Sequence, residues 1–215
     1  MGNVSDLLSA RVKFVTGIDM NETFIAHCQA EKSSNQGFIC QDIEKVDYRS
    51  ISPINGAWAS FSLSYLRKPE EFLLHLREVL EPDSWVALVD VSCFLSGNMP
   101  LNGKYHDRVR EYETESWRTG IYDFDFGSKL EPVLENAGFK VVYTDHDVPD
   151  QELNFSGPAT SEVLNNWVSR LERMKGLRNR FSGHYSEVCE ELLSYIGSPS
   201  RSARGNVRFA VGVKI

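Results

Sequence analysis

Two acidic residues each close a short apolar run, and the first of them could bind a nucleoside. Asp19 follows the β-branched run Val12–Ile18, and Asp42 ends the run that begins at Phe38. If both runs are strands of an open parallel sheet, their carboxyl ends lie at the edge where such sheets bind ligands. A carboxylate there can accept hydrogen bonds from both hydroxyls of a ribose, so Asp19 is a candidate nucleoside ligand.

Each carboxylate also has a purely structural interpretation. In this interpretation, the sole role of Asp19 is to cap the helix that is expected to begin near Asn21. Asp42 could cap a turn or a short helix over Ile43–Tyr48. The residues alone leave both alternatives open.

The apolar pattern around these carboxylates alternates between strand and helix. This alternation predicts an α/β fold: a Rossmann-like, doubly wound, mostly parallel sheet with an antiparallel last strand and helical insertions. The last strand alternates enough to be expected at an edge. The expected strands are 12–18, 38–42, 57–61, 85–91, 139–144 and 207–213, and the expected helices are 3–10, 22–31, one from Pro69 that the turn 81–84 stops, and 127–138.

Two long segments interrupt this alternation. Residues 93–126 are polar and aromatic, with a helix expected over 105–117, and a segment of this length between strands is typically a functional lid or a disordered loop. Residues 149–204 form a second, helical insertion, with two helices expected over 159–175 and 183–196. We therefore expect one domain, 1–215, with a lid insertion and a helical insertion.

Composition limits the classes of function. The chain has 215 residues, 41% of them hydrophobic, and a formal net charge of -7, which argues against a nucleic-acid-binding surface. The four cysteines form no CxxC pair and are typical of reduced thiols, so a cytoplasmic protein without a zinc site is expected. No apolar run reaches the length that spans a membrane, and no His/Asp/Glu cluster has metal-ligand spacing.

Four segments in order resemble the class I S-adenosylmethionine-dependent methyltransferases. Gly17-Ile18-Asp19-Met20 resembles the strand tip that holds the ribose, and Gln41-Asp42-Ile43 resembles the motif that accepts from the adenine amino group. Trp58–Leu66 resembles the strand and loop that face the methionine end of the cofactor, and Phe72–Asp90 resembles the following helix, turn and strand. The usual Pro-Gly-Gly turn is Pro82-Asp83-Ser84 here.

The resemblance implies S-adenosylmethionine as cofactor and assigns roles to particular residues. Asp19 would hold the ribose hydroxyls and Asp42 the adenine amino group, while Met20 and Ile43 would flank the ring. The cofactor-binding residues implied are Gly2, Asp19, Met20, Asp42, Ile43, Phe61 and Ser62.

The family's first strand and its glycine-rich loop should precede Asn3, and only Gly2-Asn3 resembles the end of that loop. This departure implies either a truncated chain or alternative start, or a fold that closes without the strand. In the second case, the missing strand would leave backbone groups of the sheet unpaired. These groups would have to pair directly with a neighbouring strand or with another chain.

The two insertions are the expected acceptor site, because they would wall the methyl group off from water. Tyr65, Tyr105, Trp117 and Tyr122 are the candidate substrate-binding residues. His106 or His146 could act as general base for a hydroxyl acceptor, although methyl transfer can also proceed by proximity and orientation alone. The basic run from Arg170 to Arg180 is either a solvated helix face or a contact for an anionic acceptor or partner.

Three functions remain open on the sequence. The first is methyl transfer from S-adenosylmethionine to an oxygen or nitrogen of a small-molecule acceptor, with no nucleic-acid or membrane partner. The second is a truncated or non-catalytic methyltransferase-fold protein that serves in binding or interaction. The third is another doubly wound nucleotide-binding enzyme such as a dehydrogenase, against which Asp42 and the antiparallel last strand argue. The oligomeric state stays unknown.

Overall fold

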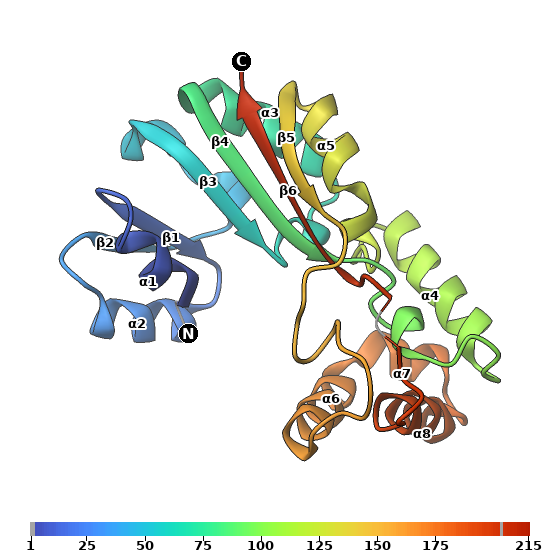
Figure 1. Ribbon diagram of the computed structural model, residues 1–215. Coiled ribbons are helices and arrows are strands. Elements are labelled where there is room, and N and C mark those ends of the chain that lie inside the picture. Colours follow the sequence, from blue (N-terminus) through green and yellow to red (C-terminus); the bar gives the residue numbers. More distant parts are fainter. Residues whose placement is uncertain (1–2, 203) are drawn as a thin grey trace. The chain divides into compact units, whose positions relative to one another are not determined.

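The computed structural model describes residues 3–202 and 204–215, and the chain divides into two compact units, one up to Ile54 and one from Asn55 to Ile215 (Figure 1). Each unit has a sheet of its own, and each is described by itself. The expectation of a single domain over 1–215 stays a prediction.

The first unit is a two-stranded parallel sheet with helices around it. Its strands are β1 (Val15–Asp19) and β2 (Gln36–Cys40), paired so that Asp19 lies opposite Cys40. Gly17 leaves room for the Phe38 ring, which would lie 2.6 Å from a Cβ at that position. The parallel pairing puts the carboxyl ends of both strands at one edge, as expected. The remaining elements are α1 (Asn3–Ser9), α2 (Glu22–Glu31) and the 3₁₀ turns η1 (Ile43–Lys45) and η2 (Tyr48–Ile51).

The second unit contains a four-stranded sheet in the order β3-β4-β6-β5 (Figure 1). Its strands are β3 (Ile54–Ser60), β4 (Leu80–Val91), β5 (Phe139–Asp145) and β6 (Val207–Lys214), with α3 (Pro69–Val79) between β3 and β4 and α5 (Leu130–Asn136) before β5. Since β6 is antiparallel to both β4 and β5, those two strands run in the same direction. The α/β, Rossmann-like class with an antiparallel last strand is therefore confirmed.

The position expected for the last strand is wrong. Strand β6 lies inside the sheet, between β4 and β5, and not at an edge. Its alternation arises because one face is buried, where Gly212 lies against Leu134 of α5, while Phe209 and Val211 on the other face stay half-exposed. One-sided burial produces period-two alternation in a central strand as readily as in an edge strand.

Two other boundaries differ from expectation. Residues 81–84 do not form a separate turn but belong to β4, with Asp83 at a φ of +60°. The second insertion holds three helices instead of two: α6 (Ser161–Arg173), α7 (Lys175–Arg180) and α8 (Tyr185–Ile196). The first insertion holds η4 (Ser96–Asn98) and α4 (His106–Arg118), and η5 (Phe126–Lys129) follows it.

Both insertions share one hydrophobic core, and we call residues 93–126 and 149–204 together the cap. Leu95 and Val109 from the first insertion are buried in the same cluster as Trp167, Leu177 and Leu192 from the second. The Trp167 indole also donates a hydrogen bond of 2.9 Å to the Glu152 carbonyl. The two insertions are thus one packed layer, not two separate flaps.

None of the helices in the described residues combines the length and the apolar character that crossing a bilayer requires.

Candidate functional site

In the first unit, Asp19 ends β1 with an exposed carboxylate. Its Oδ1 accepts a hydrogen bond of 2.7 Å from the Asn21 amide. The cap of α2 is made by Asn21 itself, whose side chain accepts from the Phe24 amide at 3.1 Å. Within the described part of the chain nothing bonds to Asp19 Oδ2, so one oxygen is available to a ligand.

Asp42 caps the short 3₁₀ helix that follows it, which is the structural alternative to a role in ligand binding. Its Oδ1 accepts from the Glu44 amide at 3.0 Å, which caps η1, and its Oδ2 lies 3.1 Å from the Lys45 ammonium. The Glu44 hydrogen bond and then Lys45 lower the pKa of Asp42 below its ordinary value. A carboxylate that stays ionised has about four lone-pair sites, so these contacts leave room for a further donor.

The two strand tips lie side by side. The Gln41 amide donates to the Asp19 carbonyl at 3.0 Å, and the Cys40 thiol donates to the Met20 carbonyl at 3.7 Å. The Met20 side chain is 67% exposed and Ile43 is half-buried. This edge therefore offers two carboxylates and apolar surface, which fits the hydroxyls, amino group and ring of a nucleoside. Gly2, the other residue expected here, lies outside the described residues.

In the second unit, an aromatic surface lies at the carboxyl ends of β3 and β4. Phe61 follows β3 with a φ of +52°, and its amide donates to the Val89 carbonyl at 2.9 Å. Ser62 then begins η3 (Leu63–Tyr65). The exposed Tyr65 ring lies edge-on to Tyr122, with centroids 4.7 Å apart, so these two predicted substrate-binding residues are brought together.

Asp90, which the sequence analysis missed as a site residue, is the last residue but one of β4, and its charge acts on Tyr122. Its side chain is 1% exposed, and burial raises its pKa to about 7 even though the Val91 amide donates to it at 2.8 Å. The sequence does contain a pattern that could have identified Asp90. It is an acidic residue near the end of an apolar run, as Asp19 and Asp42 are. Burial also raises the pKa of Tyr122 above its ordinary value, with the Asp90 charge as the next cause.

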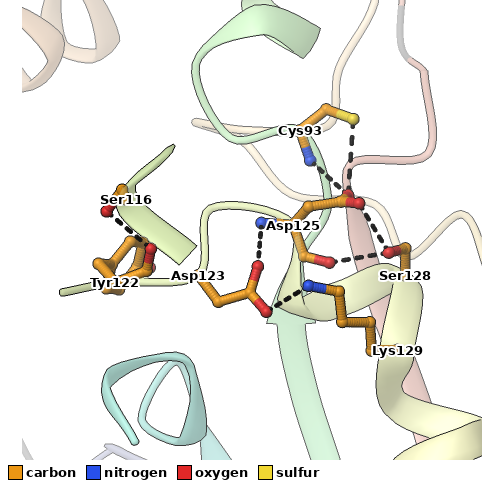
Figure 2. Close-up of polar contacts among 7 residues, drawn as sticks. All are labelled: Cys93, Ser116, Tyr122, Asp123, Asp125, Ser128 and Lys129. Atoms are coloured by element: carbon orange, nitrogen blue, oxygen red, sulfur yellow. Dashed lines mark hydrogen bonds and ion pairs between the residues drawn. The ribbon is translucent and has the colours of Figure 1, made fainter. Parts of the chain in front are cut away.

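Two further carboxylates, Asp123 and Asp125, belong to the loop before η5 (Figure 2). Asp123 accepts from Lys129 Nζ at 2.5 Å and from the Asp125 amide at 3.1 Å. The Asp125 carboxylate accepts from the Cys93 amide at 3.0 Å and from Ser128 Oγ at 2.8 Å, while the Cys93 thiol lies 3.5 Å away. Burial, with Asp125 next, raises the pKa of Cys93 to about 11, so this thiol stays protonated at neutral pH and is not a nucleophile.

The same contacts extend to Trp117, a third predicted substrate-binding residue. Lys129 Nζ lies 4.2 Å from the centroid of the exposed Trp117 ring. Ser116 Oγ, from the same helix, donates to the Tyr122 carbonyl at 2.8 Å. Helix α4 is thus linked to Tyr122 through Ser116, while Trp117 contacts Lys129.

Tyr105, the fourth predicted substrate-binding residue, does not lie on this surface. Its ring is buried in the cap core and packs edge-on against Phe181 at 6.2 Å, and its hydroxyl donates to Glu187 Oε2 at 2.6 Å. The aromatic pattern could not separate this residue from Tyr65 or Tyr122, since packing partners far along the chain decide which ring is buried.

The two candidate bases have other partners. His106 is buried, with Nδ1 3.1 Å from Asp107 Oδ1. His146 is exposed, with Nε2 3.2 Å from Glu131 and Nδ1 3.3 Å from Arg208. Of the contacts described, none joins either histidine to the tyrosine pair.

The basic run is largely engaged within the chain. Arg170 pairs with Glu152 at 2.9 Å and lies over the Trp167 ring, Arg180 lies 3.5 Å from Glu115, and Arg178 lies over the Tyr185 ring. These contacts favour the solvated-face interpretation for most of this run. No group of three His, Cys, Asp or Glu side chains in residues 3–202 and 204–215 is arranged to hold a metal ion.

The order and direction of these strands are similar to the fold of the S-adenosylmethionine-dependent methyltransferases. Residues 1–88 match the family model of the methyltransferase domain. The predicted resemblance to class I enzymes is therefore confirmed, and the fold agrees with it.

Solved structures support the fold over nearly the whole chain. The [4+2]-cyclase SpnF shares 16% identity at a TM-score of 0.58, over 99% of this chain and 70% of that one. An S-adenosylmethionine-dependent methyltransferase from Mesorhizobium loti shares 14% identity at a TM-score of 0.52, over 98% and 85% of the two chains. Another from Methanosarcina mazei shares 14% identity at a TM-score of 0.54, over 100% and 88%. No curated protein sequence matches this chain.

Proposed function

We propose that this protein transfers the methyl group of S-adenosylmethionine to an oxygen or nitrogen of a small-molecule acceptor. The observation that carries the proposal is the edge where β1 and β2 end: Asp19 closes β1, and Asp42 follows the paired strand β2 by two residues, both within the segment that matches the methyltransferase domain. S-adenosylmethionine, when bound, supplies an electrophilic methyl group on a sulfonium.

The residues of this chain would bind and orient that cofactor. Asp19 accepts from the ribose hydroxyls through its free oxygen, and Asp42 accepts from the adenine amino group. Met20 and Ile43 flank the ring. Phe61 and Ser62 serve the methionine end, in keeping with the sequence resemblance.

The acceptor would lie against Tyr65, Tyr122 and Trp117. Proximity and orientation suffice for a good nucleophile. For a hydroxyl acceptor we propose His106 or His146 as general base. The net charge of -7 supports a small acceptor over a nucleic acid.

Calorimetric titration with S-adenosylmethionine and its demethylated product tests the cofactor site. We expect micromolar binding by the wild-type chain and roughly tenfold or greater weakening in Asp19→Ala, because a hydrogen bond to a charged group contributes about 1.5–3 kcal/mol. Asp47→Ala is the matched control: Asp47 Oδ1 accepts from the Arg49 amide at 3.2 Å in a similar turn of the same unit. That variant should bind as the wild type does.

Two outcomes would contradict the proposal. If the folded wild-type chain binds neither compound, the non-catalytic alternative is favoured. If both variants lose affinity equally while circular dichroism shows them folded, Asp19 has no particular role in the site.

A further inference from the structure

Arg201 is a buried cation that forms no ion pair with an acidic residue in the described part of the chain. It lies in the segment before β6 and is 4% exposed. Its guanidinium donates to the Asn98 side chain at 2.5 Å, to the Leu153 carbonyl at 3.1 Å and to the Phe155 carbonyl, and it lies 3.6 Å from the centroid of the Phe155 ring. All of these partners are neutral, and within residues 3–202 and 204–215 its buried Nε has no hydrogen-bond partner.

Arg204 brings a second guanidinium to the same place. Its Nη2 donates to the Met99 carbonyl and to the Tyr195 hydroxyl, both at 2.9 Å, and these partners are again neutral. Met99 follows Asn98, to which Arg201 donates, so the two arginines bind successive residues of one turn. The side chain of Arg204 is half-buried, so this residue reaches solvent where Arg201 does not.

The two positive charges act on each other. Burial lowers the pKa of Arg201; Tyr195 acts in the opposite direction, and the charge of Arg204 lowers the pKa again. None of the ion pairs that the structure describes includes Arg201 or Arg204. Buried charges in proteins are normally paired, so a pair of like charges among neutral partners needs another source of negative charge.

We propose that Arg201 and Arg204 bind a small oxyanion, a phosphate or a carboxylate. The planar guanidinium fork suits the geometry of both groups. The free Nε of Arg201 would donate from the buried side, and Arg204 would close the site from the solvent side. The site does not depend on the proposed methyl transfer, and it can be tested without any acceptor.

Thermal unfolding with added inorganic phosphate tests this site. The proteins are the wild-type chain, Arg204→Gln and, as matched control, Arg173→Gln, whose arginine is exposed on α6. Glutamine at 204 keeps an amide donor for Met99 and Tyr195 and removes one charge, as the control does. Arg201 is left unchanged because its contacts hold the cap together. Sodium chloride at matched ionic strength measures general salt effects, and acetate replaces phosphate in a parallel series.

We expect phosphate or acetate at tenfold over its Kd to raise the Tm of the wild type and of Arg173→Gln by about 3–5 °C relative to chloride, with no such rise in Arg204→Gln. At equal concentrations of the two anions, the one giving the larger rise is the preferred group. An equal rise in all three proteins, or no rise in the wild type with either anion, would overturn the proposal.

Discussion

Asp90 shows how burial changes the chemistry of one residue. Its folded pKa of about 7 lies above the ordinary value of 3.8, because desolvation disfavours the charged form. Between these two pH values the folded state binds more protons than the unfolded state. The free energy of unfolding should therefore fall as the pH rises from about 4 to 7 and stay level above that range.

The Asp90→Asn variant tests this linkage, since asparagine keeps an acceptor for the Val91 amide without a charge. Relative to the wild type, we expect it to gain about 2–4 kcal/mol in unfolding free energy between pH 4 and pH 8. Urea unfolding at both pH values measures the gain. Asp83→Asn, at an exposed position of the same strand, should show no comparable change. A pH-independent difference between Asp90→Asn and the wild type would refute the linkage.

At the scale of elements, one carboxylate joins helix α4 to the turn after β4. Glu113 is buried in α4, and its oxygens accept from the Leu95 amide at 2.7 Å, from the Ser96 amide at 3.2 Å and from Ser96 Oγ at 2.5 Å. Burial raises its pKa above the ordinary value, while these hydrogen bonds act in the opposite direction. The start of η4 is thereby held by a residue far along the chain.

Removing the Glu113 carboxylate should weaken the contact between α4 and the turn after β4 and so lower the free energy of unfolding. Glu113→Ala leaves three donors without their acceptor, and we expect a loss of about 2–4 kcal/mol in unfolding free energy. Glu113→Gln keeps one acceptor oxygen and should lose less. Denaturant unfolding compares both with Glu111→Ala, an exposed position of α4 that should stay within about 0.5 kcal/mol of wild type. Equal stabilities for Glu113→Ala and Glu111→Ala would show that the joint contributes nothing.

At the scale of the whole molecule, the two insertions share one core, which continues into Val91 at the end of β4 and Val207 at the start of β6. Trp167 is fully buried in that core. Trp167→Ala should lower the unfolding free energy by about 3–5 kcal/mol, as large-to-small changes in packed cores do. Val168→Ala, on the exposed side of the same helix, should have little effect. A wild-type-like Tm for Trp167→Ala would mean that the cap is a loose lid after all.

Local pattern determined much of this protein. The strands and helices around Asp19, Asp42 and Pro69 follow from apolar periodicity and capping, which act over a few residues. The parallel pairing of β1 and β2 followed from the same pattern, and with it the neighbouring positions of the two carboxylates. The sequence itself also carried the resemblance to the methyltransferases.

The tertiary structure alone decided what depends on residues far apart in the chain. It placed β6 between β4 and β5, joined the two insertions into one core, and separated the buried Tyr105 from the exposed Tyr65. It also buried Asp90 and Glu113 and gathered Arg201 and Arg204 without a carboxylate. Burial and charge pairing are set by long-range packing, so local periodicity does not contain them.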